Sequence, residues 1–240
     1  MKLRHYITCI LLLSSLSLFA QSGSASKATS ASETVPPDTS KHTFDHKMKD
    51  AYIGLGFVLG NSNAGAAVKY GESREFIIGT GLGYRFVKWN GIGVDIYYKS
   101  TGFFLSQDST KILPDNTLHN SEKISFDNFG GEVFDRFFIG PVFLDGGFYF
   151  DWTFYTKHIT WDNHAVANTS GGSSTKSIDR QLVFTNSTNY GLVFRLGRGT
   201  GTSLYFNYRM SKLFKKNPLA VTDIPELPVY VLGLTLGLHD

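Results

Sequence analysis

Alternating apolar and polar positions dominate the chain from Ala51 to its end. The clearest stretch reads VFLDGGFYFDWTFYTKH, from Val142 to His158, and every second residue from Val142 to Phe154 is apolar or glycine. Because successive side chains of a strand point to opposite faces, this stretch predicts one long strand with an apolar face and a polar face. It is longer than the roughly 9–11 residues that a tilted transmembrane strand needs.

Eight stretches of this kind follow one another. They cover residues 51–59, 75–86, 92–101, 124–139, 142–158, 182–196, 203–211 and 230–238. Only Lys88-Trp89-Asn90-Gly91 separates the second from the third, and Asn-Gly is a favoured turn of tight hairpins. We therefore expect these two strands to pair directly.

The fourth stretch has the weakest alternation. Asp135 falls on its apolar face, and the phase before Phe129 slips by one residue. One extra residue in a strand reverses the side to which all later side chains point. We therefore predict a bulge at Gly130-Gly131.

The links between the strands alternate in length. Short links follow the second, fourth and sixth strands, and longer polar links follow the others. Bacterial outer-membrane barrels have an even number of antiparallel strands, short periplasmic turns and longer extracellular loops. The pattern thus predicts an all-β fold, an eight-stranded antiparallel up-and-down transmembrane β-barrel of this kind.

A soluble eight-stranded barrel is the alternative, with its apolar faces turned inward. The polar faces here are rich in glycine and carry isolated charges, which suits a crowded lumen better than a wall exposed to water. Aromatic residues also stand near strand ends, as in the interfacial belt of a membrane protein. The predicted belt consists of Trp89, Tyr98, Trp152, Tyr208 and Tyr230.

The N-terminus has the order of a secretory signal. Residues 1–20 begin with Lys2 and Arg4, continue with an apolar run and end on small residues, so we expect cleavage after Ala20 or Ala25. The Ser- and Thr-rich residues 21–50 are expected to form a flexible periplasmic leader, and 51–240 the barrel. These features predict localisation in the cell outer membrane.

The polar faces collect acidic and basic residues in nearly equal numbers. An unpaired charge in a confined site is costly, so these side chains are expected to pair and to plug the lumen rather than to line a conducting path. The predicted ion-pair network consists of Glu75, Arg85, Asp95, Lys99, Glu132, Arg136, Asp145, Asp151, Arg195 and Arg209.

Catalytic and metal sites are the weaker hypotheses. Outer-membrane hydrolases combine histidine with serine or an acidic residue, but such a site is recognised by its geometry and not by the presence of the residues. Metal binding by His158 and His164 lacks a second pair of ligands. We expect a non-enzymatic protein with no catalytic residue, cofactor or metal. The candidates for the alternative are His119, His158, His164, Ser106, Ser121 and Asp162.

Several segments resemble the outer-membrane β-barrel domain family that includes the PorT-like proteins. They are LFAQ at 18–21, AYIGLG at 51–56, GYRF at 83–86 with GIGV at 91–94, and VLGLTLG at 231–237. One departure is the end, Leu238-His239-Asp240, where many such barrels have an aromatic residue. The resemblance implies shared architecture more than shared activity.

Two functions follow as expectations. The first is a structural or interaction protein that acts through extracellular loops around 102–123 and 160–180. The second is a component of a secretion or transport assembly, as the PorT-like resemblance implies; a small pore or a hydrolase ranks lower. Expected partners are outer-membrane lipid, the insertion machinery and other envelope or secretion proteins. A net charge of +3 without a basic cluster argues against nucleic acid.

Overall fold

The computed structural model describes residues 46–60, 68–109, 111, 113, 117–164, 173–215 and 226–239. The predicted signal and the leader up to residue 45 lie outside the described residues. Among the described residues, no helix is long and apolar enough to span a membrane. The strands are β1 (Lys47–Leu59), β2 (Arg74–Val87), β3 (Asn90–Phe104), β4 (Ser121–Ile139), β5 (Val142–His164), β6 (Ser173–Arg180), β7 (Thr188–Arg198), β8 (Thr200–Arg209) and β9 (Tyr230–His239).

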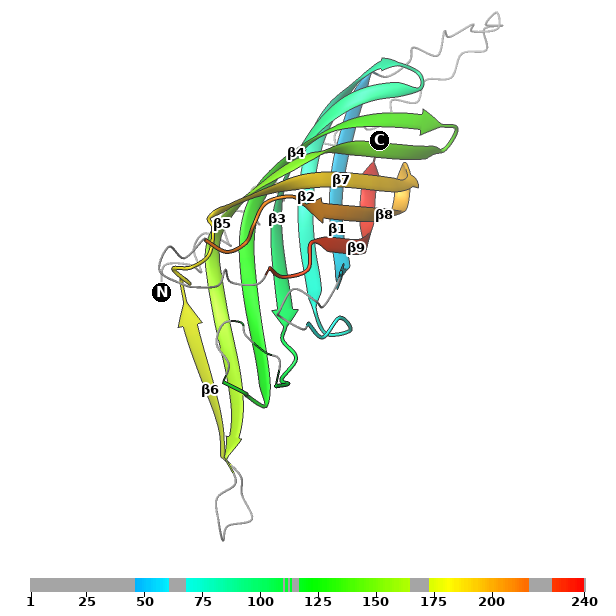
Figure 1. The fold of residues 1–240 in the computed structure, drawn as a ribbon. Coiled ribbons are helices and arrows are strands. Elements are labelled where there is room, and N and C mark those ends of the chain that lie inside the picture. The colour runs from blue at the N-terminus through cyan, green and yellow to red at the C-terminus, as the bar shows by residue number, and fades with distance from the viewer. Residues whose placement is uncertain are drawn as a thin grey trace, which may run out of the picture. The chain divides into compact units, whose positions relative to one another are not determined.

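Eight of these strands close into an antiparallel barrel (Figure 1). Each pairs with its neighbour in the order β1, β2, β3, β4, β5, β7, β8 and β9, and the pairing of β9 with β1 completes the circle. The short links 88–89, 140–141 and 199 lie at one end, and the long links lie at the other. The predicted eight-stranded antiparallel barrel is confirmed.

The ninth strand, β6, lies outside the closed barrel. β5 is 23 residues long; its first part, Val142–Trp152, pairs with β7, and its last part, Lys157–His164, pairs with β6. The expected loop at 160–180 was therefore wrong for 160–164, which end β5, and for 173–180, which form β6 and pair with them. Because both faces of β6 are exposed, its sequence SSTKSIDR carries no alternation from which to predict a strand.

Leu182 and Phe184, expected to begin the sixth strand of the barrel, precede that strand. β7 begins at Thr188, and the two side chains pack against the apolar cluster at the loop end of the barrel. Their apolar character reflects burial beneath a loop.

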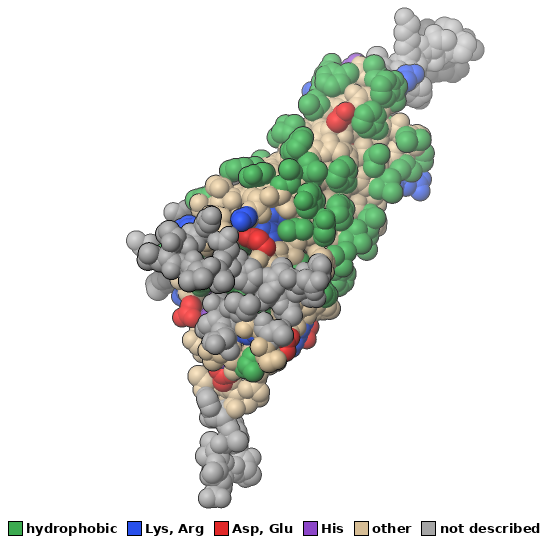
Figure 2. Space-filling model, in the orientation of Figure 1, with side chains coloured by type: hydrophobic (Ala, Val, Ile, Leu, Met, Phe, Trp, Pro, Cys, Tyr) green, Lys and Arg blue, Asp and Glu red, His purple; other side chains and the backbone are tan. Residues whose placement is uncertain are grey.

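The barrel is inverted relative to a soluble protein: apolar side chains point outward and charged side chains point inward. Leu82 is 69% exposed and Phe148 68%, whereas Asp95, Arg136 and Asp145 are fully buried. Figure 2 shows hydrophobic side chains gathered over the barrel wall. The arrangement expected of a soluble barrel, with apolar faces inside, is not observed.

The bulge predicted at Gly130-Gly131 lies elsewhere. These glycines pair regularly with Tyr97 and Ile96 of β3, and the inward positions of β4 keep the same phase before and after them, at Asn128 and Glu132. The irregularity is in β5, where Thr153 pairs with Asn128 and Tyr155 with Asp127, so that Phe154 is the extra residue. As a consequence, Thr156, His158 and Thr160 turn inward after the bulge.

β1 begins at Lys47, four residues before the predicted start at Ala51. Its alternating burial extends back through Asp50 and Met48, which both point into the barrel. Residues 47–50, expected in the leader, thus belong to the wall.

An apolar cluster fills the loop end of the lumen. Its buried members include Phe103, Leu105, Leu113, Phe126, Leu213, Phe214 and Leu227. Several of these belong to the links that follow β3 and β8, so the described parts of these two links cover the charged residues beneath.

Candidate functional site

The charged interior of the barrel is the candidate functional site. Arg136 occupies the layer nearest the short turns, where its guanidinium binds two carboxylates at once. Nε donates to Asp145 Oδ1 at 2.7 Å and Nη2 to Asp145 Oδ2 at 2.9 Å, and Nη1 and Nη2 donate to Asp50 Oδ1 and Oδ2, both at 2.9 Å. Paired, planar hydrogen bonds of this kind are the strongest that arginine makes.

Arg195 forms the adjoining contact and shares Asp145 with Arg136. Its Nη1 lies 2.8 Å from Asp95 Oδ2, its Nη2 2.8 Å from Glu132 Oε1, and its Nε 3.0 Å from Asp145 Oδ2. The two arginines therefore hold four carboxylates across β1, β3, β4 and β5. The guanidinium of Arg195 also faces the Phe134 ring, 4.4 Å from its centroid.

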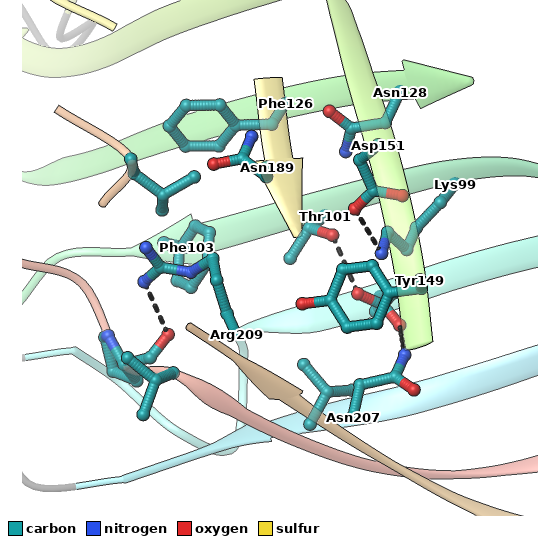
Figure 3. Close-up of a pocket in the computed structure, with 15 residues that line it drawn as sticks. Lys99, Thr101, Phe103, Phe126, Asn128, Tyr149, Asp151, Asn189, Asn207 and Arg209 are labelled. Atoms are coloured by element: carbon teal, nitrogen blue, oxygen red, sulfur yellow. Dashed lines mark hydrogen bonds and ion pairs between the residues drawn. The ribbon is translucent and has the colours of Figure 1, made fainter. Parts of the chain in front are cut away.

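A second layer lies nearer the long links (Figure 3). Lys99 Nζ contacts Asp151 Oδ2 at 2.5 Å and lies 4.4 Å from the centre of the Tyr149 ring. Thr101 donates to Glu75 at 2.9 Å, and Tyr97 donates to Asp151 at 2.7 Å. Every one of these side chains is buried.

A cavity of about 40 Å³ lies in this second layer, lined by residues that include Lys99, Tyr149 and Arg209. A smaller one, of about 10 Å³, lies beside Tyr52 and Arg195. A water molecule needs about 10–15 Å³ by this measure, so the two spaces suit a few water molecules. Neither accommodates an organic substrate.

Arg209 closes the second layer toward the long links. It donates to Glu226 at 2.8 Å and to the carbonyl oxygens of Ser211, Leu227 and Pro228. Its role therefore differs from the prediction, because it fastens the link between β8 and β9 over the lumen instead of pairing with a predicted lumen acid.

The remaining predicted lumen residue, Arg85, lies at the end of the barrel with the short turns. It is partly exposed, and its guanidinium stacks on Phe138 at 3.4 Å from the ring centroid. The predicted members that the structure joins by ion pairs to one another are Asp95, Lys99, Glu132, Arg136, Asp145, Asp151 and Arg195.

Sequence reasoning missed Asp50 and the inward tyrosine hydroxyls. Asp50 was assigned to the leader, although the inward positions Met48, Asp50 and Tyr52 continue the alternation of β1 backwards. Tyr97 and Tyr205 stand on inward faces and hydrogen-bond to Asp151 and Glu75. Buried tyrosine hydroxyls usually find such a partner, which was the available signal.

The predicted aromatic belt residues lie at both ends of the apolar wall. At the loop end, Tyr98 packs against Phe129 with ring centroids 5.9 Å apart, and Tyr208 stacks on Tyr230 at 5.2 Å. Trp152 neighbours Phe154, the bulge residue, at 6.3 Å. At the other end Trp89, 60% exposed, stacks on Phe137.

Two of the candidate histidines bind carboxylates beyond the loop-end aromatic residues. His119 donates from Nδ1 to Asp162 at 2.9 Å, and His158 donates from Nε2 to Glu122 at 2.7 Å. His164 ends β5, and its side chain is outside the described part; Ser106 and Ser121 are partly exposed. No group of three or more possible metal ligands occurs among the described residues.

Glu122 is the centre of this outer polar cluster. It accepts hydrogen bonds from Gln107 and His158, each at 2.7 Å, and pairs with Lys111 at 2.8 Å. Burial raises its pKa, but the hydrogen bonds from His158, Lys111 and Gln107 outweigh burial, so the pKa is lowered. Glu122 therefore fastens the link after β3 to the wall.

Comparison with known proteins adds no assignment: no family model and no curated protein matches the chain. The structure itself establishes the fold, which is a closed eight-stranded antiparallel β-barrel. The resemblance to PorT-like proteins stays a prediction.

Proposed function

We propose that this protein is an integral outer-membrane β-barrel with a sealed lumen, which acts as a structural or interaction protein through the segments beyond its loop end. The observation that carries the proposal is the inverted barrel, with apolar side chains outside and ion pairs within. Apolar side chains such as Leu82 and Phe148 project from a wall that has no open sheet edge. A lipid bilayer accepts such a wall, because every strand finds a backbone partner.

Two features support the proposal of a sealed lumen, the arginine contacts and the apolar cluster. Arg136 and Arg195 join β1, β3, β4, β5 and β7 across the interior, and the apolar cluster covers them toward the long links. Eight strands leave an interior that side chains can fill. The cavities of about 40 and 10 Å³ leave room for a few waters and not for a continuous pore.

The interaction role is supported by the hairpin of β5 and β6. Residues 157–164 and 173–180 pair beyond the closed barrel, and among the described strands β6 pairs only with β5. An unpaired strand edge is a common site for an extended segment of another protein. The charges of Lys176, Asp179 and Arg180 protect this edge against indiscriminate pairing.

The test combines localisation, folding and conductance. The full-length chain should fractionate with the outer membrane, migrate differently on gels with and without boiling, and give no stable openings in a planar bilayer. Recovery in a soluble fraction would contradict the membrane assignment. Stable openings from a folded, heat-modifiable protein would contradict only the sealed lumen.

A component of a secretion or transport assembly is the second candidate, and the projecting hairpin favours it. Cross-linking and recovery in mild detergent should yield a stoichiometric envelope partner from cells with the intact protein. A variant in which a two-residue turn replaces residues 161–176 should lose that partner while it remains heat-modifiable. Recovery of the intact protein without a partner would favour a free-standing barrel.

The non-enzymatic assignment has its own test. His119 and His158 each donate to a carboxylate, and a hydrolase of the serine type also needs a nucleophile beside the histidine base. Lipase, deacylase and protease activities should be equal in the wild type and in a His119→Ala/His158→Ala variant. An activity that this variant loses while it stays folded would overturn the assignment.

A further inference from the structure

Four basic side chains stand at one level on the outward wall, just beyond the loop-end aromatic residues. The strand registers align Arg74 of β2, Gly102 of β3, Ser125 of β4, Lys157 of β5 and Arg180 of β6 as successive direct partners. Directly opposite residues of neighbouring strands point to the same side of the sheet. We call Arg74, Lys123, Lys157 and Arg180 the outer basic row.

Lys123 enters this row by lying across Gly102. A Cβ placed on Gly102 would overlap the end of the Lys123 side chain, whose Nζ also lies 5.1 Å from the centre of the Phe104 ring. Ser125 faces outward but is only 8% exposed. The small residues Gly102 and Ser125 thus form the floor between the amines of Lys123 and Lys157.

The cations of the row are crowded against one another. Lys157 and Arg180 are direct cross-strand partners, a placement that is unfavourable for like charges. The pKa of Lys123 is lowered, first by burial and then by the charge of Lys157. An anion seated between these side chains would relieve the repulsion.

The neighbouring carboxylate does not balance the row. Asp127 is 3.4 Å from Lys157 and accepts a hydrogen bond from Ser100 at 2.6 Å. Asp179 neighbours Arg180 in sequence, but it pairs with His158 on the other side of the sheet. Among the described residues, one carboxylate, that of Asp127, therefore stands against Lys123, Lys157 and Arg180 on the outward side.

We propose that the outer basic row binds the anionic headgroup of a membrane lipid, through its phosphate or an equivalent oxyanion, at Lys123, Lys157 and Arg180 with Arg74 beside them. This inference rests on the proposed membrane function. The row lies four residues along β3 from Tyr98, about 13 Å along the strand at 3.3 Å per residue. Aromatic side chains of membrane proteins mark the headgroup level, so cations just beyond them meet lipid phosphates.

A lipid is favoured over a free anion by the setting of the row. It is an open strip on a wall that continues into the exposed apolar side chains of β3 and β4, such as Ile96 and Val133. Acyl chains would pack along that apolar wall while the headgroup contacts the lysines. A free phosphate would contact the lysines but would make no apolar contact with the wall.

The experiment is native mass spectrometry of the purified full chain in non-ionic detergent. The probes are phosphatidylglycerol, zwitterionic phosphatidylcholine and inorganic phosphate. The row variant is Lys123→Gln/Lys157→Gln/Arg180→Gln. The control Lys176→Gln/Lys212→Gln/Lys215→Gln removes three positive charges from the same end of the barrel but outside the row. Gel migration without boiling confirms that each variant is folded.

The wild type and the control should prefer phosphatidylglycerol over phosphatidylcholine by about tenfold in dissociation constant, and the row variant should lose most of this preference. Gly102→Ile keeps every charge but displaces Lys123, so it should weaken phosphatidylglycerol binding several-fold. Equal losses in the row variant and the control would show unspecific attraction and overturn the site. Binding of inorganic phosphate as tightly as phosphatidylglycerol would overturn the lipid assignment.

The failure of this inference is distinguishable from that of the proposed function. A chain that is heat-modifiable and resists extraction from vesicles by alkaline carbonate, yet shows no preference for phosphatidylglycerol, contradicts the headgroup site alone. Extraction of the chain from vesicles by alkaline carbonate would contradict the proposed membrane function, and the headgroup site would fail as a consequence.

Discussion

Arg136 on β4 and Asp50 on β1 are 86 residues apart in the sequence and are joined by two hydrogen bonds of 2.9 Å inside the barrel. The same guanidinium binds Asp145 on β5, so one side chain connects three strands. Both partners of the long-range pair are almost completely buried. This contact defines the register of the end of the barrel at which the short turns lie.

Replacement of Arg136 should be strongly destabilising. Arg136→Met leaves Asp50 and Asp145 without their main cation, and removal of one partner of a buried pair costs about 3–5 kcal/mol. Guanidinium-induced unfolding of the protein in lipid vesicles, followed by tryptophan fluorescence, measures this loss. The matched change Arg198→Met, at an exposed position of β7, should alter stability by about 0.5 kcal/mol or less. Equal effects of the two changes would contradict the sealed ion-pair layer.

If the outward apolar wall faces lipid, the cost of a lysine substitution on it should depend on how deep the residue lies in the bilayer. Leu234→Lys places a cation near the middle of β9, where it should cost about 2–4 kcal/mol in a bilayer. Tyr155→Lys, which points outward beyond the loop-end aromatic residues, should cost about 1 kcal/mol or less. The two variants are compared by their folding yield and by their denaturation midpoint in vesicles. A larger loss from Tyr155→Lys would show that the membrane level is misplaced.

Thr153 faces the lumen, so a lysine at this position would meet other side chains and not lipid. Thr153 is buried, donates to Asn128 at 2.6 Å and accepts from Asn189 at 3.1 Å. We expect Thr153→Lys to be as damaging as a cation on the lipid face. A mild effect would indicate a lumen less filled than described.

Gly130 is required by the close approach of two inward side chains. A Cβ at Gly130 would overlap the ring of Tyr97 and the carboxylate of Asp151. Gly130→Leu should therefore prevent heat-modifiable folding or cost about 1–3 kcal/mol, as overpacking does. Gly146→Leu is the matched control, since a Cβ at Gly146 meets only the Phe194 ring at 3.8 Å. Comparable gel shifts for both variants would contradict the packing of the second layer.

Acid should loosen the link that follows β3. The pKa of Glu122 in the folded protein lies below its ordinary value of 4.5, so its carboxylate adds stability that is present above that value and is lost as the pH falls through the folded pKa. Amide exchange of residues 103–109 should therefore be slower in the wild type than in Glu122→Gln at neutral pH. The difference should shrink below about pH 4.5. A difference in exchange rate that stays constant with pH would show that ionisation of Glu122 is not its cause. The control is Glu72→Gln, which removes an exposed carboxylate.

Periodicity was sufficient for the barrel, but the glycines and isolated charges of the polar faces were needed to predict that these faces point inward. The alternation from Val142 to Phe154 is a local signal that directly reflects the period of a strand. The short link also predicted the pairing of β2 with β3, but the turn itself is Lys88-Trp89, and Asn90-Gly91 begin β3. The inward ion pairs followed from the same alternation, because Asp95, Glu132, Asp145 and Arg195 occupy polar faces.

The partners and the irregular elements could not be predicted in this way. Which carboxylate meets Arg136 depends on strand register and on closure by β9, which are long-range properties. The apparent slip in β4 arose because Ile124 and Phe126 are apolar but point inward into the apolar cluster. The bulge at Phe154 of β5 interrupts a stretch that reads as a continuous strand, so the sequence did not reveal it. β6 is exposed on both faces and therefore lacks the apolar residues from which strands are predicted.

The most direct test of the account is the environment of alternate residues on β9. In a Cys9→Ser background, which removes the only cysteine of the chain, a single cysteine replaces Leu234 or Thr235 in protein reconstituted into vesicles. A thiol reagent that partitions into the bilayer should modify the cysteine at position 234, which is exposed on the outer wall, and leave the cysteine at position 235, which is buried in the lumen, almost unmodified. Equal modification at both positions, or modification of both by a water-soluble reagent alone, would contradict a lipid-facing wall around a sealed interior.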